Sequence, residues 1–415
     1  MTLTDASRAR SNRGAALRLR ILLAGYLMVV AAFFVLDARA HRLLYHAALT
    51  APLLLLLIRD LPARPLLARP AMGLSLLFLG YLALSALWSV AAGPPQMLEQ
   101  MAKGLSVGTF LLATLVLAER VPDFEEKLAA AVALAGLALG AASIAVHIAG
   151  TPAADLATAR LSGIGRGANA NFAAVLFAAA ALCAETCRRR WRGRPGLRIL
   201  ASLALGVCVL ALCMTQSRGP VLAFAAACAL MLAAQRRWRA LAALALAAAA
   251  ASWAAYSHLR SMPVVARADS YRLEIWQRTW DHIVVHPWFG VGVATERPLP
   301  MADGVLIPFP HSILISNQYY GGVVASLLLG LLLLAVAAGL LRRHRAGGDP
   351  LPAALLCLGM VAGLFDFRLV PRGINPEYLY FWLPVALAAA ASPRQSSVGQ
   401  PYASDSGAPA ILSSR

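Results

Sequence analysis

The chain has 415 residues, of which 60% are hydrophobic and only 13% are charged. A soluble protein of this length normally carries about a quarter of charged residues, so the composition excludes an ordinary soluble enzyme. The net charge of +18 would suit a nucleic-acid-binding protein, but membrane proteins also concentrate Lys and Arg in their cytoplasmic loops. We therefore predict a membrane protein that binds no nucleic acid.

Apolar runs of roughly 20 residues, the length that crosses about 30 Å of hydrocarbon, recur along the chain. Such runs must be helical in lipid, because each backbone amide then finds its partner within the same segment. The sequence predicts an all-α polytopic protein with about twelve membrane-spanning helices, at residues 21–37, 43–58, 71–92, 104–118, 128–149, 171–187, 199–215, 220–235, 240–257, 318–341, 350–366 and 377–392. Ten or eleven spans remain as alternatives if a short segment such as 220–235 enters the membrane without crossing it.

The segments between these spans alternate in charge. One set holds 24 of the 37 Lys and Arg residues and the other set holds 13. The richer set belongs on the cytoplasmic side by the positive-inside rule, which places both termini in the cytoplasm. The predicted organisation is a cytoplasmic segment, nine spans, a large outer loop, three spans and a disordered cytoplasmic tail, at residues 1–20, 21–257, 258–317, 318–392 and 393–415 respectively.

The outer loop 258–317 contains a predicted amphipathic helix at 269–285. Its apolar residues Trp276, Trp280 and Ile283 recur at helical spacing among charged residues, as in helices that lie on a membrane surface. Asp269 or Ser270 can cap its start, and the sequence from His286-Pro287 to Gly292 ends it.

A second helix is predicted to follow Pro308 and Pro310 and to continue into the next span. His311, Ile315, Gln318 and Gly322 recur along one face of that helix. His311 is either an interfacial residue or a proton acceptor, since histidine exchanges a proton readily near neutral pH.

Two further outer segments carry arginines that need an explanation. Residues 215–220 form a predicted tight turn with Arg218 at the membrane interface, and residues 160–171 form a Gly- and Asn-rich loop with Arg160 and Arg166. An Arg near the membrane is costly without an anionic partner. We expect an anionic ligand at Arg218, and Arg272 of the amphipathic helix is a second candidate.

Several kinds of chemistry leave no mark in the sequence. There is no nucleotide-binding loop and no zinc motif such as HExxH, and the six cysteines lie in or beside apolar runs without metal spacing. The outer carboxylates, Asp366 among them, are scattered without a paired arrangement. No metal and no cofactor are expected.

In combination, these outer motifs resemble those of the O-antigen ligases and their relatives, the O-antigen polymerases and the bacterial O-oligosaccharyltransferases. The matching pieces are Ser217-Arg218-Gly219, Tyr271-Arg272 with Trp276, the run from His286 to Gly292, the run from His311 to Gly322, and Arg160 with Gly163, Asn169 and Asn171. Ser312 departs from the pattern, because Asn often follows the histidine in the family. A tail too short for an oligosaccharyltransferase favours the ligases.

The resemblance implies a GT-C-like membrane glycosyltransferase with a periplasmic catalytic loop, located in the bacterial inner membrane. It would move a preassembled O-antigen glycan from undecaprenyl pyrophosphate to a sugar hydroxyl of lipid A–core in lipopolysaccharide biosynthesis. His311 would deprotonate the acceptor hydroxyl, and Arg218, Arg272 and Arg160 would bind the pyrophosphate. Direct displacement would invert the anomeric carbon, and we expect no metal requirement.

The partners expected from the resemblance are the lipid-linked donor, the lipid A–core acceptor and membrane lipids, with the protein as a monomer. The alternatives are an O-antigen polymerase or an O-oligosaccharyltransferase with the same donor, or a transporter of anionic lipids. The charged groups gather on one outer face, whereas coupled transport sites usually lie at the bilayer midplane, which argues against the transporter. Trp276, Trp280 and Trp288 either anchor the loop at the interface or stack on sugars.

Overall fold

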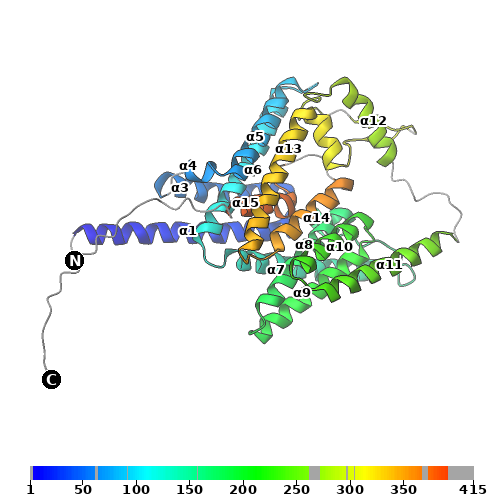
Figure 1. Cartoon of the computed structure of the whole chain (residues 1–415), viewed down its shortest axis with the longest axis horizontal. Coiled ribbons are helices and arrows are strands. Elements are labelled where there is room, and N and C mark those ends of the chain that lie inside the picture. Colours follow the sequence, from blue (N-terminus) through cyan, green and yellow to red (C-terminus); the bar gives the residue numbers. More distant parts are fainter. Residues whose placement is uncertain are drawn as a thin grey trace.

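The computed structural model describes residues 3–60, 64–90, 92–156, 158–260, 272–295, 298–302, 304–366 and 373–390, and these ranges are almost wholly helical (Figure 1). The α-helices are α1 (Leu3–Val35), α2 (Ala38–Tyr45), α3 (Ala51–Arg59), α4 (Arg64–Leu67), α5 (Pro70–Ser85), α6 (Pro94–Arg120), α7 (Phe124–Gly150), α8 (Ala170–Arg190), α9 (Pro195–Met214), α10 (Arg218–Ala234), α11 (Trp238–Arg260), α12 (Arg272–Val285), α13 (Ile313–Arg345), α14 (Leu351–Asp366) and α15 (Leu383–Ala390). Shorter helical turns are η1 (His46–Thr50), η2 (Ala86–Trp88), η3 (Gly165–Ala168) and η4 (Tyr378–Trp382). Strands β1 (Leu299–Pro300) and β2 (Leu306–Ile307) form one small antiparallel hairpin.

Every apolar segment expected from the sequence coincides with a helix. Eight described helical segments are long and apolar enough to cross a membrane, namely Gly14–Val35, Ala38–Arg59, Pro70–Trp88, Pro94–Arg120, Phe124–Gly150, Ala170–Arg190, Pro195–Met214 and Ile313–Arg345. Four shorter apolar helices, Arg218–Ala234, Trp238–Ala250, Leu351–Asp366 and Tyr378–Ala390, fall on the other four predicted spans. The chain is a polytopic membrane protein, and the full count of twelve crossings stays a prediction.

Helix α8 forms the centre of the bundle and packs against α7, α9, α10 and α14. Its run of alanines is almost fully buried, because small side chains let neighbouring helix backbones approach closely within a membrane. Gly136 of α7 shows how close this approach is, since a Cβ there would overlap the Cβ of Ala180. The small residues of α8 therefore set the spacing of the helices whose ends carry the candidate site.

The second span departs from a regular helix. The predicted helix 43–58 is divided into α2, the π-helical turn η1 and α3. Tyr45 at the end of α2 is fully buried and donates a 2.6 Å hydrogen bond to the carbonyl oxygen of Ser106 in α6. A π-turn shifts the register of a helix and often lies at a functional site. Here it fixes the face of α2 that points toward α6.

Helix α12 agrees with the predicted amphipathic helix, but its caps Asp269 and Ser270 lie outside the described residues. The helix ends at Val285, directly before His286-Pro287 as predicted. Trp280 and Trp288 are largely exposed, which agrees with a segment lying on a surface. Figure 1 shows α12 at the same extremity of the molecule as the first part of α13 and one end of α5.

The predicted helix after Pro310 is present, but two residues of its predicted face are not in regular helix. His311 precedes the helix with φ 55°, and α13 begins at Ile313 with Ser312 as its N-cap. Gly322 has φ 66° and ψ −164° and interrupts α13. The expectation of one continuous face from His311 to Gly322 was therefore wrong, because both residues adopt left-handed backbone conformations that a helix excludes.

The interruption of α13 is stabilised by the glycine-rich run that follows α12. The N–H groups of Val291 and Gly292 donate to the carbonyl oxygens of Tyr319 and Tyr320, each at 2.9 Å, because the kink frees these carbonyls from helical partners. A Cβ on Gly322 would overlap the carbonyl oxygen of Trp288. The run from His286 to Gly292 thus closes a broken helix and fixes α12 beside α13.

Candidate active site

The candidate site lies where the ends of several helices meet, and the last two residues of α14, Phe365 and Asp366, are its meeting point. The first residues of α8 and α10, the first residue of α12 as the structure describes it, and the residue two before α13 all border this pair. A strict alternation of the predicted spans assigns all of these helix ends to one side of the membrane. The site is thus assembled from segments whose contacting residues are as far as 195 positions apart in sequence.

His311 is paired with a carboxylate. Its Nδ1 atom lies 2.9 Å from Oδ1 of Asp366, and the two side chains are 26% and 28% exposed. An ionised carboxylate only accepts hydrogen bonds, so Nδ1 carries the proton and donates it to Asp366. The Nε2 atom then holds the lone pair, and the imidazole is oriented to accept a proton from a substrate.

The backbone around His311 holds this orientation. Its φ of 55° is unusual for a residue with a side chain and marks local strain of the kind found at functional sites. The Phe309 ring lies against the imidazole, with ring centroids 4.0 Å apart. Trp276 of α12 donates from Nε1 to the carbonyl oxygen of Pro310 at 3.1 Å. Trp276, expected as an interfacial or sugar-stacking residue, thus supports the loop that carries His311.

Asp366 occupies the C-terminal residue of α14, a position that is electrostatically unfavourable for a carboxylate. A carboxylate at a helix C-terminus faces the negative end of the helix dipole, which is unfavourable by about 0.3–1 kcal/mol. The side-chain amide of Asn171 offsets this cost, because its Nδ2 donates to Oδ2 of Asp366 at 3.0 Å. The carboxylate therefore has one oxygen on His311 and the other on Asn171.

Arg160 connects this network to the turn before α10. Its guanidinium donates to Oδ1 of Asn171 at 3.2 Å, to the carbonyl oxygen of Thr215 at 3.0 Å and to Oγ of Ser217 at 3.0 Å. These partners are all neutral, so they satisfy the donors of Arg160 without neutralising its charge. The contacts make Arg160 a positioning residue for the turn, and its direct contact with a phosphate stays a prediction.

The predicted tight turn at residues 215–220 is confirmed, and Arg218 is the first residue of α10. Gln216 in this turn has φ 52°, which lets the chain reverse directly after α9. Gly219 lies against Phe365, since a Cβ on Gly219 would be 3.7 Å from that of Phe365. The turn thus brings the exposed Arg218 side chain to the end of α14.

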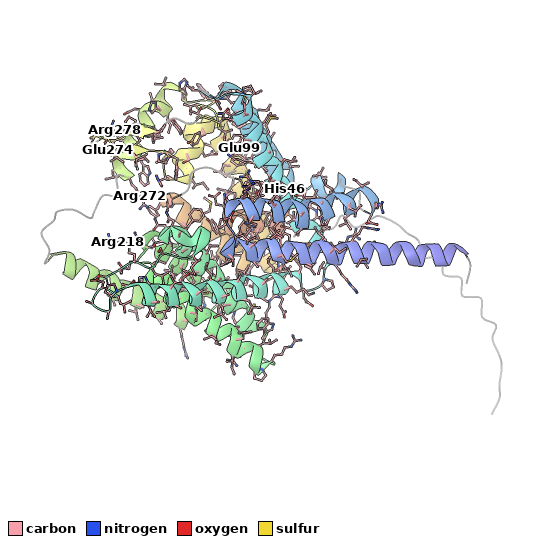
Figure 2. All side chains as sticks on the ribbon, turned by 180° about the vertical axis from the view of Figure 1, so that it is seen from behind. His46, Glu99, Arg218, Arg272, Glu274 and Arg278 are labelled. Carbon is pink, nitrogen blue, oxygen red and sulfur yellow. The ribbon has the colours of Figure 1, made fainter. Side chains whose placement is uncertain are left out.

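Arg272 reaches the same place from α12. The centre of its guanidinium lies 5.7 Å from the centroid of the Phe365 ring, a distance that suits a cation–π contact. Figure 2 shows Arg272 and Arg218 near each other, with Glu274 and Arg278 farther along α12. Of the predicted residues, the structure therefore brings together His311, Arg160, Arg218 and Arg272 around Phe365 and Asp366.

Both arginines lie in a setting that favours an anion. Arg218 stands at the first residue of α10, where the backbone already presents positive partial charge and N–H groups, and Arg272 lies beside the Phe365 ring. Within the described residues, neither Arg218 nor Arg272 makes an ion pair with a carboxylate. A cation at a helix N-terminus without an acidic partner is unfavourable until an anion binds, and phosphate is well suited to this position.

An open cavity of about 620 Å³ lies beside His311. The cavity is lined by His311, Asp366 and Phe309 and by residues of α2, η1 and α6, among them Arg42 and Lys103. The described residues contain no group of three or more His, Cys, Asp or Glu side chains that could hold a metal ion. Chemically, the arrangement joins an oriented base, a cavity beside the base and two arginines suited to an anionic leaving group.

Two members of this network were not identified as functional from the sequence. Asp366 was only one of several scattered carboxylates, and Asn171 was named as part of the loop motif with Arg160 but was given no role. The sequence did contain a reason to single out Asp366. A carboxylate that ends a sixteen-residue apolar helix has a high free-energy cost at a membrane boundary unless it has a partner. The side chain of Arg166 lies outside what the structure describes.

Comparison with known proteins bears on this site. A family model described as O-antigen ligase matches residues 201–330, a stretch that contains Arg218, Arg272 and His311 but excludes Arg160, Asn171 and Asp366. A curated relative, the O-antigen ligase of Pseudomonas aeruginosa, is 28% identical over 389 residues, which cover 92% of this chain and 94% of the relative. The likeness thus extends over nearly the whole length of both proteins.

Proposed function

We propose that the chain is an O-antigen ligase that transfers a preassembled O-antigen glycan from undecaprenyl pyrophosphate to lipid A–core, in keeping with the family model that matches residues 201–330 and with the similar ligase of Pseudomonas aeruginosa. The observation that carries the proposal is the His311–Asp366 pair beside Arg218 and Arg272, which have no acidic partner among the described residues. A base and an anion site are the two elements that this transfer needs.

The transfer is a single displacement at the anomeric carbon of the donor glycan. The hydroxyl oxygen of the acceptor forms a bond to that carbon while the bond from the carbon to the pyrophosphate oxygen breaks. The hydroxyl proton moves to Nε2 of His311, and undecaprenyl pyrophosphate leaves with the bonding electron pair. Attack from the side opposite the leaving group inverts the anomeric configuration.

His311 and Asp366 divide the proton chemistry between them. Asp366 holds the imidazole in the tautomer with Nε2 free, and it stabilises the imidazolium that forms when the proton arrives. General-base catalysis of this kind contributes about 10²–10⁴-fold to a rate. Asn171 and, through it, Arg160 keep Asp366 in place.

Arg218 and Arg272 bind the pyrophosphate and stabilise the charge that it gains as the bond breaks. A guanidinium presents parallel N–H donors that match two phosphate oxygens. Preorganised donors aimed at developing charge contribute about 3 kcal/mol each. This role supports a reaction without a required metal, which remains part of the proposal.

We place the protein in the bacterial inner membrane with the His311 site on the periplasmic face, both termini in the cytoplasm and the monomer as the working unit. Two features support this orientation. The basic residues are concentrated at the opposite helix ends, and all site residues belong to helix ends that alternating spans assign to one side.

The test uses purified full-length protein with lipid-linked glycan and lipid A–core, in the absence of nucleotide and metal. The expected result is lipid A–core that carries the glycan, and activity that survives EDTA. A product in which glycans are joined to each other on the carrier lipid would assign the chain to the polymerases instead. No transfer of any kind would refute the proposed reaction.

A further inference from the structure

The cavity beside His311 contains charged groups that the transfer described so far does not use. Its volume of about 620 Å³ lies within the range of roughly 300–1,000 Å³ that is usual for small-molecule sites. Arg42 and His46 come from α2 and η1, and Glu99 and Lys103 come from the first turns of α6. Figure 2 shows His46 and Glu99 set apart from Arg218 and Arg272.

The position of His311 determines which substrate the cavity admits. A general base must lie within about 2.6–3.2 Å of the atom that gives up the proton, and His311 lines this cavity. The acceptor hydroxyl therefore reaches the base from the cavity. Arg218 and Arg272, which serve the donor pyrophosphate in the proposed transfer, are not among the cavity-lining residues, so this cavity is separate from the proposed donor site.

Arg42 is available to bind an anion in this cavity. Its side chain is exposed, and it makes no ion pair within the described part of the chain. Lys103 is paired with Glu99 at 3.0 Å, but the two residues are four apart on one helix and Glu99 is 59% exposed. Such a pair contributes little stability, and an anion that enters the cavity can replace Glu99 as the partner of Lys103.

The wall that carries these cations is held firmly. Tyr45 donates to the carbonyl oxygen of Ser106 at 2.6 Å and lies 2.9 Å from Oγ1 of Thr109, which fixes the end of α2 on α6. Gly373 packs on the stem of Lys103, since a Cβ there would be 3.9 Å from Cγ of that lysine. The helices that carry Arg42 and Lys103 are therefore fixed to each other, which reduces the entropy lost on binding.

We propose that this cavity is the acceptor subsite, in which Arg42 and Lys103 bind a phosphate or carboxylate on the acceptor saccharide and thereby direct its reacting hydroxyl to His311. The inference rests on the proposed glycan transfer and adds the chemical class that the acceptor must have. It predicts that an uncharged saccharide is a poor acceptor even when its hydroxyl is correctly configured.

The experiment measures steady-state transfer by full-length Arg42→Gln and Lys103→Gln proteins, with donor and acceptor concentrations varied separately. Arg39→Gln is the matched control, because Arg39 lies on the same helix with an exposed side chain but does not line the cavity. We expect the acceptor KM to rise about tenfold or more for Arg42→Gln, the usual effect of losing a charge-assisted hydrogen bond. The donor KM and the Arg39→Gln protein should stay close to wild type.

A second measurement changes the acceptor and compares the wild-type protein with Arg42→Gln on each acceptor. The wild-type protein is given lipid A–core, intact or after enzymatic removal of its phosphates. If the anion is a phosphate, the treated acceptor has a raised KM and Arg42→Gln adds no further loss. If the anion is a carboxylate, Arg42→Gln weakens both acceptors equally. Either pattern supports the proposal.

Other outcomes overturn it without affecting the proposed transfer. An Arg42→Gln protein that behaves like Arg39→Gln removes the anion site, and a rise in donor KM alone assigns the cavity to the donor. Failure of the wild-type protein to transfer glycan at all would instead refute the reaction itself, so the two failures are distinguishable.

Discussion

The two ends of the helical bundle differ in the partners of their arginines. At the end away from His311, here called the paired end, several arginines meet carboxylates from other segments, as in Arg18–Asp60, Arg69–Glu119, Arg343–Glu125, Arg189–Asp349 and Arg190–Glu126. At the His311 end, Arg42, Arg218 and Arg272 make no ion pair among the described residues, and Arg160 contacts neutral oxygens.

The difference separates structural arginines from ligand-binding ones. A guanidinium at a membrane boundary requires an anion, and where the fold supplies one the pair joins two helices. Hydrogen bonds from Arg18 hold the pKa of Asp60 below its usual value. Beside His311, where Arg218 and Arg272 have no carboxylate partner among the described residues, we assign the anion to a ligand. The partner of an arginine side chain therefore indicates its role better than the number of arginines at each end does.

Two ion pairs at the His311 end are exceptions that fit the same account. Arg278–Glu274 and Lys103–Glu99 each join residues four apart on one helix. Pairs of this kind contribute a few tenths of a kcal/mol and hold no helices together. The interhelical ion pairs between arginine and carboxylate in the described chain thus lie at the paired end.

The largest expected effect is that of removing the base. His311→Ala should lower transfer about 10²–10⁴-fold, because the acceptor hydroxyl then has no proton acceptor. The measurement is the rate of transfer per folded protein molecule. His286→Ala is the matched control, since His286 is exposed on the nearby loop and outside the site. Equal rates for the two variants would mean that the chemistry lies elsewhere.

Replacing an unpaired arginine should have the next largest effect. Arg218→Lys and Arg272→Lys keep the charge but lose the guanidinium fork, and we expect each to lower the rate about 10²-fold. Arg278→Lys, whose partner Glu274 lies on the same helix, should remain near wild type. If Arg278→Lys is as impaired as the other two, the effect does not depend on whether the arginine has a carboxylate partner. That result would contradict the distinction between paired and unpaired arginines.

A smaller effect is expected when the base is kept but its orientation is loosened. Asp366→Asn should lower kcat less than His311→Ala does, with little change in either KM, because the carboxylate acts through His311. Asn171→Ala should cause a milder change in the same direction, since it removes one hydrogen bond from Asp366. A rise in donor or acceptor KM with kcat unchanged would show that Asp366 contacts a substrate.

The smallest effect on activity is expected at the paired end. Arg343→Gln breaks the link from α13 to Glu125 of α7, which should lower the thermal unfolding midpoint by roughly 2–5 °C. Transfer per folded molecule should not change. Thermal unfolding in detergent, followed by a rate measurement on the folded fraction, checks both parts. A stable Arg343→Gln protein with impaired transfer would contradict the structural role.

The helices could be predicted from the sequence because membrane spans depend on simple local quantities, namely length and apolar content. Arg218, Arg272 and His311 could also be identified, since unpaired polar residues beside apolar spans are conspicuous. Their meeting at Phe365 could not, because no local pattern records which helix end lies beside which. Asp366 is 55 residues from His311 in sequence, and Asn171 is farther from both.

The irregularities of the helix backbones could not be predicted from the sequence either. The π-turn at His46–Thr50 and the interruption at Gly322 depend on hydrogen bonds to other segments, so a periodic pattern of residues continued through both of them. His311 was expected within a helix for the same reason. A glycine in an apolar run is compatible with a regular helix or with a break, and only the contact with Trp288 decides between them.

The most direct test of the distinction between the two ends is a binding measurement that requires no turnover. Undecaprenyl pyrophosphate without glycan is titrated into purified wild-type protein, the Arg218→Gln/Arg272→Gln double variant and Arg343→Gln. The account predicts that the double variant binds at least about tenfold more weakly, while Arg343→Gln binds like wild type. Equal affinity for all three proteins, or weaker binding by Arg343→Gln alone, would contradict it.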